Sequence, residues 1–95
     1  MTQRRRARGT EPSSREEIET TIKKILVGSF KITEEQIAPG TKFRRDLGLD
    51  EFQSIEFAGE LEARFNVAID SDTFDRTETI AQLIDYLKLL GASAS

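Results

Sequence analysis

Apolar side chains recur at helical spacing in three stretches of the chain, and no stretch alternates as a strand would. The first stretch follows Ser13 and Ser14. Either serine can cap a helix, because glutamates stand three residues further on, as a capping box requires. The apolar face continues to about Val27, and Gly28 and Ser29 are expected to end this helix. Its apolar residues are Ile18, Ile22, Ile25 and Leu26.

A second helix is predicted from about Glu51 to Phe65, with Asp50 as its N-cap. Gly59 stands in the middle of this helix, where glycine costs about 1 kcal/mol relative to alanine. A close approach of another segment would compensate. Small residues here would also widen the cleft for a bulky chain or admit a partner's side chain, and simple drift is the alternative. The side chains expected to face the core are Phe52, Ile55, Ala58, Gly59, Leu61, Ala63 and Phe65.

The C-terminal third of the chain predicts two more helices. A short one lies between Asp70 and Asp75, and a longer one begins at Thr77 or Thr79 and stops at Gly91. The predicted fold is therefore all-α, a small four-helix bundle of three long helices and one short one.

A long connection, residues 30–49, separates the first two helices. A loop of about 20 residues is unusual in so small a domain unless it is functional or is pinned by its own apolar side chains. Residues 33–36 can form a single helical turn, and the chain then breaks at Pro39-Gly40. The pins are expected to be Phe30, Ile32, Ile37 and Phe43.

Composition narrows the possible functions. The chain has 95 residues, of which 37% are hydrophobic, enough for one small core. It contains no cysteine and no histidine, so the commonest metal ligands and the commonest general base are absent. We expect no enzymatic activity of its own, no metal site and no stable membrane insertion, and a cytoplasmic location. The expected domain spans residues 14–91, between a disordered basic tail (1–13) and a disordered C-terminus (92–95).

Charge is distributed unevenly along the chain. The tail carries four arginines and one glutamate, whereas residues 46–75 carry nine acidic residues and only Arg64 as a base. A domain this acidic attracts basic partner surfaces and repels nucleic acid. The arginine-rich tail is interpreted as a solvated leader rather than an arm for nucleic acid or anionic lipid, because no aromatic side chain, and no apolar one larger than that of Ala7, is interleaved with the arginines.

The segment 43–50, Phe-Arg-Arg-Asp-Leu-Gly-Leu-Asp, resembles the F-x-x-D-L-G-x-D signature of acyl carrier proteins. The resemblance continues through residues 61–67, Leu-Glu-Ala-Arg-Phe-Asn-Val, and covers most of the chain without a gap between Ile18 and Phe65. It implies the four-helix bundle of that family. It also implies a serine directly after the signature, to which a 4′-phosphopantetheine arm is attached.

The residue in the serine position is Glu51. A carboxylate cannot form the phosphodiester that holds the arm, so no cofactor is expected for the sequence as written. 4′-Phosphopantetheine is expected only if position 51 is natively serine or if Ser54 is used instead. Ser54 would shift the signature by three residues and lies a turn inside the helix, so it is interpreted as a solvent-facing helical serine. For Glu51, the alternatives are a stabilising first-turn acid, an imitation of the phosphate charge, or an introduced substitution.

The resemblance further implies docking on acyl-transferring or acyl-modifying enzymes that carry basic patches. The sequence therefore predicts a monomeric, armless carrier homologue that acts as an interaction or regulatory module in fatty-acid or polyketide metabolism. The alternative is a true carrier. Arg44 and Arg45 depart from the neutral or acidic loop of the family and indicate a dedicated partner. The predicted docking residues are Asp46, Asp50, Glu56, Glu60 and Glu62.

Overall fold

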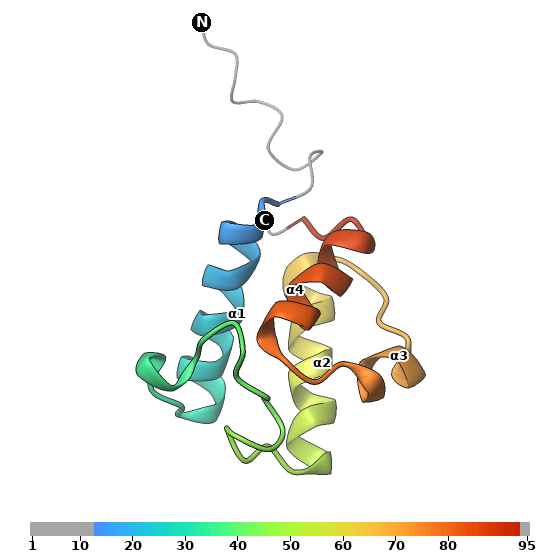
Figure 1. Cartoon of the computed structure of the whole chain (residues 1–95). Helices are drawn as coiled ribbons and strands as arrows, with labels where there is room; N and C mark the ends of the chain where they lie inside the picture. The colour runs from blue at the N-terminus through green and yellow to red at the C-terminus, as the bar shows by residue number, and fades with distance from the viewer. Residues whose placement is uncertain (1–12, 94–95) are drawn as a thin grey trace, which may run out of the picture.

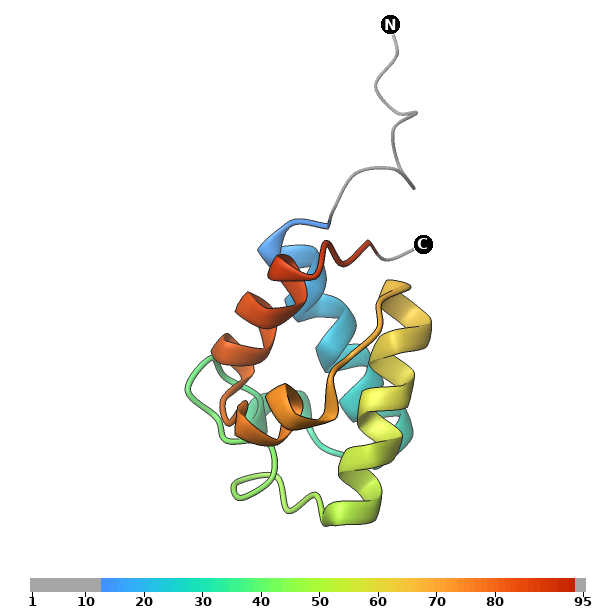
Figure 2. The same ribbon diagram turned by 90° about the vertical axis from the view of Figure 1, so that its right-hand side faces the viewer.

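The computed structural model describes residues 13–93, which form a helical bundle (Figure 1). Three long helices, α1 (Arg15–Phe30), α2 (Glu51–Phe65) and α4 (Ile80–Leu89), make up the bundle. The short α3 (Ser71–Arg76) lies before α4, and a 3₁₀ turn, η2 (Glu34–Gln36), lies in the connection between α1 and α2. Both α2 and α4 run antiparallel to α1 (Figures 1 and 2). The predicted all-α bundle of three long helices and one short one is confirmed.

Local hydrogen bonds fix the starts of the helices where the sequence predicted them. The Ser14 hydroxyl accepts a hydrogen bond from the backbone N–H of Glu17, whose carboxylate accepts one from the backbone N–H of Ser14. The same reciprocal capping box begins α2 at Asp50 and α4 at Thr79. Asp70 caps α3 with its side chain. Each cap satisfies amide groups that would otherwise lack a partner in the first helical turn.

The predicted end of α1 at Val27 is wrong. The helix passes through Gly28 and continues to Phe30, and Lys31 then adopts a left-handed conformation with φ 57°. The Phe30 ring packs edge-on against Phe57 of α2, with 6.0 Å between ring centroids. A contact between two helices therefore outweighs the low helix propensity of glycine.

The predicted buried face of α2 is also partly wrong. Phe52 and Ile55 are 70% and 64% exposed, whereas Phe57 is fully buried. The buried positions follow a spacing of three, four and four residues, which keeps them on one side of the helix. They are Ser54, Phe57, Leu61 and Phe65.

The long connection between α1 and α2 is pinned as predicted, chiefly by Phe43. This side chain is fully buried, and its ring centroid lies 5.6 Å from that of Phe57 and 5.5 Å from that of Phe74. The backbone N–H of Phe43 donates to the carbonyl of Glu78 over 3.1 Å, next to a bridge between Lys42 and the segment before α4. Side-chain packing and a backbone hydrogen bond therefore both hold the loop in place.

The sequence suggested that Arg44 faces a dedicated partner, but its side chain makes contacts within the fold. Its guanidinium donates to the carbonyls of Phe74 over 2.8 Å and Thr77 over 2.7 Å. It also lies 4.8 Å above the Phe43 ring and 4.9 Å above the Phe74 ring, within the range of a cation–π interaction. Arg44 thus joins the loop to the C-terminal end of α3.

The structure moves the expected boundaries of the domain outward. The backbone N–H of Ser13 donates to the carbonyl of Ala92 over 2.8 Å, and Ala92 is fully buried. The backbone N–H of Ser93 donates to the carbonyl of Phe65 over 3.2 Å. Ser13, Ala92 and Ser93 therefore belong to the folded part rather than to the tails. The arginine-rich stretch of the expected tail lies outside the described residues.

Arg44→Ala is expected to destabilise the fold by roughly 1.5–3 kcal/mol, because it removes charge-assisted hydrogen bonds from two carbonyls near α3. Arg45→Ala is the matched control, since the neighbouring Arg45 side chain is 77% exposed. Urea denaturation followed by circular dichroism measures both free energies of unfolding. Equal losses in the two variants would contradict the role given to Arg44.

The cap of α3 makes stability depend on pH. Backbone and hydroxyl hydrogen bonds from Thr73 lower the pKa of Asp70. Since the folded protein then binds this proton more weakly than the unfolded chain, the stabilisation is present above the ordinary aspartate pKa and is lost as the pH falls through the folded pKa. Asp70→Asn keeps a side chain that can cap the helix but has no carboxyl group to titrate. The fall of the urea midpoint at acid pH should therefore be smaller in this variant. Asp72→Asn, at an exposed position of the same helix, should leave this fall unchanged.

Candidate functional site

The start of α2 presents Glu51 as the first helical residue, with an exposed side chain. Gly48 lies just before it at φ 73°, a conformation that glycine adopts without strain. The buried Leu49 anchors the approach to the helix. The carboxylate of Asp50 accepts a hydrogen bond from the backbone N–H of Gln53 over 2.7 Å. Position 51 is therefore held at a well-formed helix start.

The side chain at this position does not fit a phosphopantetheine arm. Attachment needs a hydroxyl that attacks the pyrophosphate of coenzyme A, and Glu51 has none. Its negative charge instead lies in the first turn of α2, where the positive end of the helix dipole stabilises it by about 0.3–1 kcal/mol. The start of α2 thus favours a negative charge at position 51 and offers no hydroxyl there.

Ser54 differs from its prediction as a solvent-facing serine. Its side chain is on the buried face of α2, with 5% exposure, and its hydroxyl oxygen has no hydrogen-bond partner within residues 13–93. The physical reason is the register of α2, which turns positions 54 and 57 inward together. A hydroxyl enclosed in this way does not present itself to coenzyme A, which argues against Ser54 as an attachment site.

Three of the five predicted docking carboxylates accept hydrogen bonds from backbone N–H groups of the fold. Asp50 caps α2, and the carboxylate of Asp46 accepts from the backbone N–H of Lys42 over 2.9 Å. The carboxylate of Glu62 accepts from the backbone N–H of Ile69 over 2.8 Å, on the segment that leaves α2. These three acids fix backbone segments on either side of the helix in addition to any role toward a partner.

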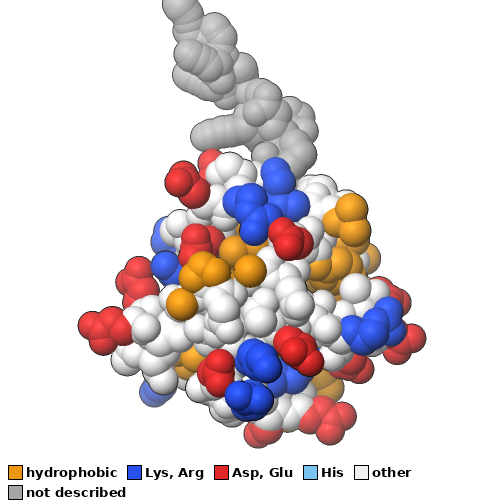
Figure 3. Space-filling model, in the orientation of Figure 1, with side chains coloured by type: hydrophobic (Ala, Val, Ile, Leu, Met, Phe, Trp, Pro, Cys, Tyr) orange, Lys and Arg blue, Asp and Glu red, His pale blue; other side chains and the backbone are white. Residues whose placement is uncertain are grey.

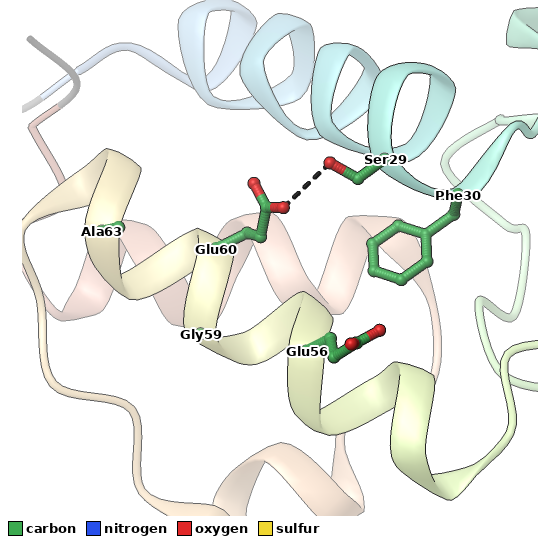
Figure 4. A pocket seen from close by; sticks show the side chains of 6 residues that line it. All are labelled: Ser29, Phe30, Glu56, Gly59, Glu60 and Ala63. Atoms are coloured by element: carbon green, nitrogen blue, oxygen red, sulfur yellow. Dashed lines mark hydrogen bonds between the residues drawn. The ribbon is translucent and has the colours of Figure 1, made fainter.

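The other two predicted acids, Glu56 and Glu60, lie one helical turn apart beside an open hollow of about 490 Å³. The hollow lies between the C-terminal end of α1 and the middle of α2 (Figure 4). Glu60 accepts a hydrogen bond from the Ser29 hydroxyl over 2.9 Å, which links the two helices at its rim. The lining residues are Ser29, Phe30, Glu56, Gly59, Glu60 and Ala63.

Gly59 opens this hollow. A Cβ built at Gly59 would meet nothing within 4 Å. The expectation that another segment of this chain approaches Gly59 closely is therefore wrong within the described structure. The expectations of a wider cleft for a bulky chain and of room for a partner's side chain stay predictions.

α2 carries an exposed apolar stripe that was not predicted from the sequence. Phe52 and Ile55 are three residues apart and largely exposed, and the acids Glu51 and Glu56 flank them in the sequence. A signal for this arrangement was present, because Ser54, Phe57, Leu61 and Phe65 already form a complete buried face at helical spacing. Phe52 and Ile55 then fall outside that face.

Charged side chains of both signs lie beside one another on the face seen in Figure 3. The ion pairs that the structure shows join Arg15 with Asp85, Lys23 with Glu19, Arg44 with Asp75, and Arg45 with Asp46. Within the described part of the chain, none of these pairs involves Glu51, Glu56 or Glu60. Among residues 13–93, no cation therefore pairs with the acids at the start and middle of α2.

No group of three histidine, cysteine, aspartate or glutamate side chains is placed to hold a metal ion within residues 13–93. None of the helices described there is long and apolar enough to cross a membrane.

Comparison with known proteins agrees with the geometry. The profile of the phosphopantetheine attachment site family matches residues 20–87. Acyl carrier protein 2 of Pseudomonas aeruginosa is 37% identical over 73 residues, which is 77% of this chain and 92% of that protein. The acyl carrier protein of Chlorobium phaeovibrioides is 35% identical over 71 residues, covering 75% and 91%. A solved structure of the acyl carrier protein from Enterococcus faecalis superposes with a TM-score of 0.71 at 28% identity, covering 82% and 99%.

Ser54→Ala is expected to be neutral or to stabilise the protein by up to about 1 kcal/mol, because it removes a buried hydroxyl that has no partner. Thermal and urea denaturation measure the change. Ser71→Ala is the control, at an exposed serine that begins α3. A loss of 1–2 kcal/mol or more in Ser54→Ala, roughly the cost of a broken buried hydrogen bond, would show that the hydroxyl has a partner after all.

Proposed function

The chain belongs to the acyl carrier protein family, and from this premise we propose that it is an armless member that docks on acyl-handling enzymes through α2. Members of this family carry acyl groups and are not themselves catalysts, so the chain is not an enzyme. The proposed role is that of an interaction or regulatory domain in fatty-acid or polyketide metabolism. The observation that supports the proposal is the well-formed helix start at Glu51, directly after the family signature, where the side chain is a carboxylate and not a hydroxyl.

The outward side of α2 supports docking. Phe52 and Ile55 supply apolar area that a partner can cover, and Glu51 and Glu56 supply negative charge beside it. Charge complementarity mainly raises the encounter rate and orients the partner, while apolar burial supplies affinity. The partner class that fits is a cytoplasmic acyl-transferring or acyl-modifying enzyme with a basic patch around an apolar centre. The proposed binding unit is the monomer.

A second candidate is a true carrier whose position 51 is natively serine. The match over residues 20–87, which includes position 51, supports it equally well. Attachment to Ser54 has less support, since its side chain is buried whereas those of Phe52 and Ile55 are exposed. The two candidates share the scaffold and the partner class, and they differ only in the group at position 51.

Intact-mass spectrometry after incubation with coenzyme A and a broad-specificity phosphopantetheinyl transferase tests the proposal. The parent chain should show no added mass, and Glu51→Ser should be modified completely, because the scaffold around position 51 is intact. Modification should persist in Glu51→Ser combined with Ser54→Ala, which serves as the control for the attachment site. The parent protein, added in excess, should slow the modification of Glu51→Ser by competing for the transferase. Modification of the parent would contradict the armless assignment, and lack of competition would contradict docking.

A further inference from the structure

We propose that the hollow between α1 and α2 receives the guanidinium group of an arginine on the docked partner. This inference rests on the proposed docking function and extends the docking face from α2 to the end of α1. The walls of the hollow are the carboxylates of Glu56 and Glu60, the ring of Phe30 and the hydroxyl of Ser29, and its floor is Gly59 with Ala63 (Figure 4).

Charge is the first argument for a cationic occupant. Glu56 and Glu60 are four residues apart on one side of α2, a spacing at which like charges repel each other. In the part of the chain that the structure describes, neither acid forms an ion pair, and Glu60 has only the neutral Ser29 hydroxyl as a donor. A cation between the two carboxylates removes their repulsion. An acyl chain in the same place would instead desolvate two charges without compensation.

Shape is the second argument. Gly59 has no side chain, and no atom within 4 Å would obstruct one, so the fold itself does not require glycine here. With only Gly59 and Ala63 below it, the aliphatic stem of a long side chain can lie directly on the helix. The hollow is therefore open in the direction from which a partner on α2 would approach.

The aromatic wall favours arginine over lysine. The Phe30 ring is held edge-on by Phe57, at 6.0 Å between centroids and 84° between planes, so its position is fixed before a partner arrives. A planar guanidinium stacks on an aromatic ring and donates to two carboxylates at once, which an ammonium group does not do. The same protein already uses this arrangement internally, where Arg44 lies over the rings of Phe43 and Phe74.

A titration of the full ¹⁵N-labelled chain with N-acetylarginine amide at low ionic strength tests the site directly. We expect saturable shifts of the amide signals of Ser29, Gly59 and Glu60, with a Kd of about 1–10 mM. N-acetyllysine amide should bind about fivefold more weakly or less, and the uncharged citrulline analogue should give no saturable shift. Equal binding of the arginine and lysine probes would overturn the assignment of a guanidinium.

Gly59→Leu distinguishes binding in the hollow from nonspecific attraction to the acidic surface, because the leucine side chain fills the hollow and every charge stays in place. The affinity for the arginine probe should fall by about tenfold or more in this variant. Gly28→Leu is the matched control: its helical glycine also has no neighbour within 4 Å and does not line the hollow, so the affinity should stay unchanged. Circular dichroism checks that both variants are folded.

Charge-neutralising variants complete the test. Glu60→Gln should weaken the arginine probe about fivefold, whereas Glu35→Gln, at an exposed acid on η2, should not, although the net charge changes equally. Shifts spread evenly over all acidic residues and preserved in Gly59→Leu would overturn the proposal. The titration uses neither coenzyme A nor an enzyme, so its failure leaves the proposed function standing. Conversely, failure of the mass-spectrometric test does not change the result expected of the titration.

Discussion

The burial of Phe43 between α2 and α3 is the contact on which the rest of the structure depends. This side chain comes from the long connection, yet it is fully buried against Phe57 and Phe74. Its backbone pairs with the segment before α4, and the next residue, Arg44, joins the same loop to the end of α3. A loop of this length would otherwise lose much conformational entropy on folding without compensation. With Phe43 fixed, the signature segment that follows delivers Glu51 to a defined place at the start of α2.

The register of α2 then places some of its apolar residues in the core and others on the surface. Phe57, Leu61 and Phe65 fill the core, whereas Phe52 and Ile55 remain on the surface beside the acids. Burial of a phenylalanine side chain stabilises the folded state by about 1.5–3 kcal/mol. An exposed phenylalanine does not provide this stabilisation to a small domain. An exposed pair of this kind is consistent with area reserved for a partner.

Features set by local hydrogen bonds were predictable from the sequence, and features set by contacts between helices were not. The capping boxes and the start of α2 follow from residues three positions apart, so both were found. The end of α1 was missed because Phe30 is held by Phe57, 27 positions further along the chain. The assignment of position 51 to the attachment site comes from the adjoining signature and stays a prediction. The hollow could not be predicted, because it exists only where the end of α1 passes Gly59.

Under the proposed function, the carboxylate of Glu51 has a consequence for the partner. A phosphate at the start of α2 and a carboxylate at the same place both present negative charge at the positive end of the helix dipole. A basic patch that recognises this charge, together with Phe52, Ile55 and Glu56, meets much the same surface in either case. The difference arises after docking, because no arm reaches the active site of the partner. A bound domain without an arm occupies an acyl-handling enzyme but delivers no acyl group to it. This is the physical basis for assigning the domain a regulatory role.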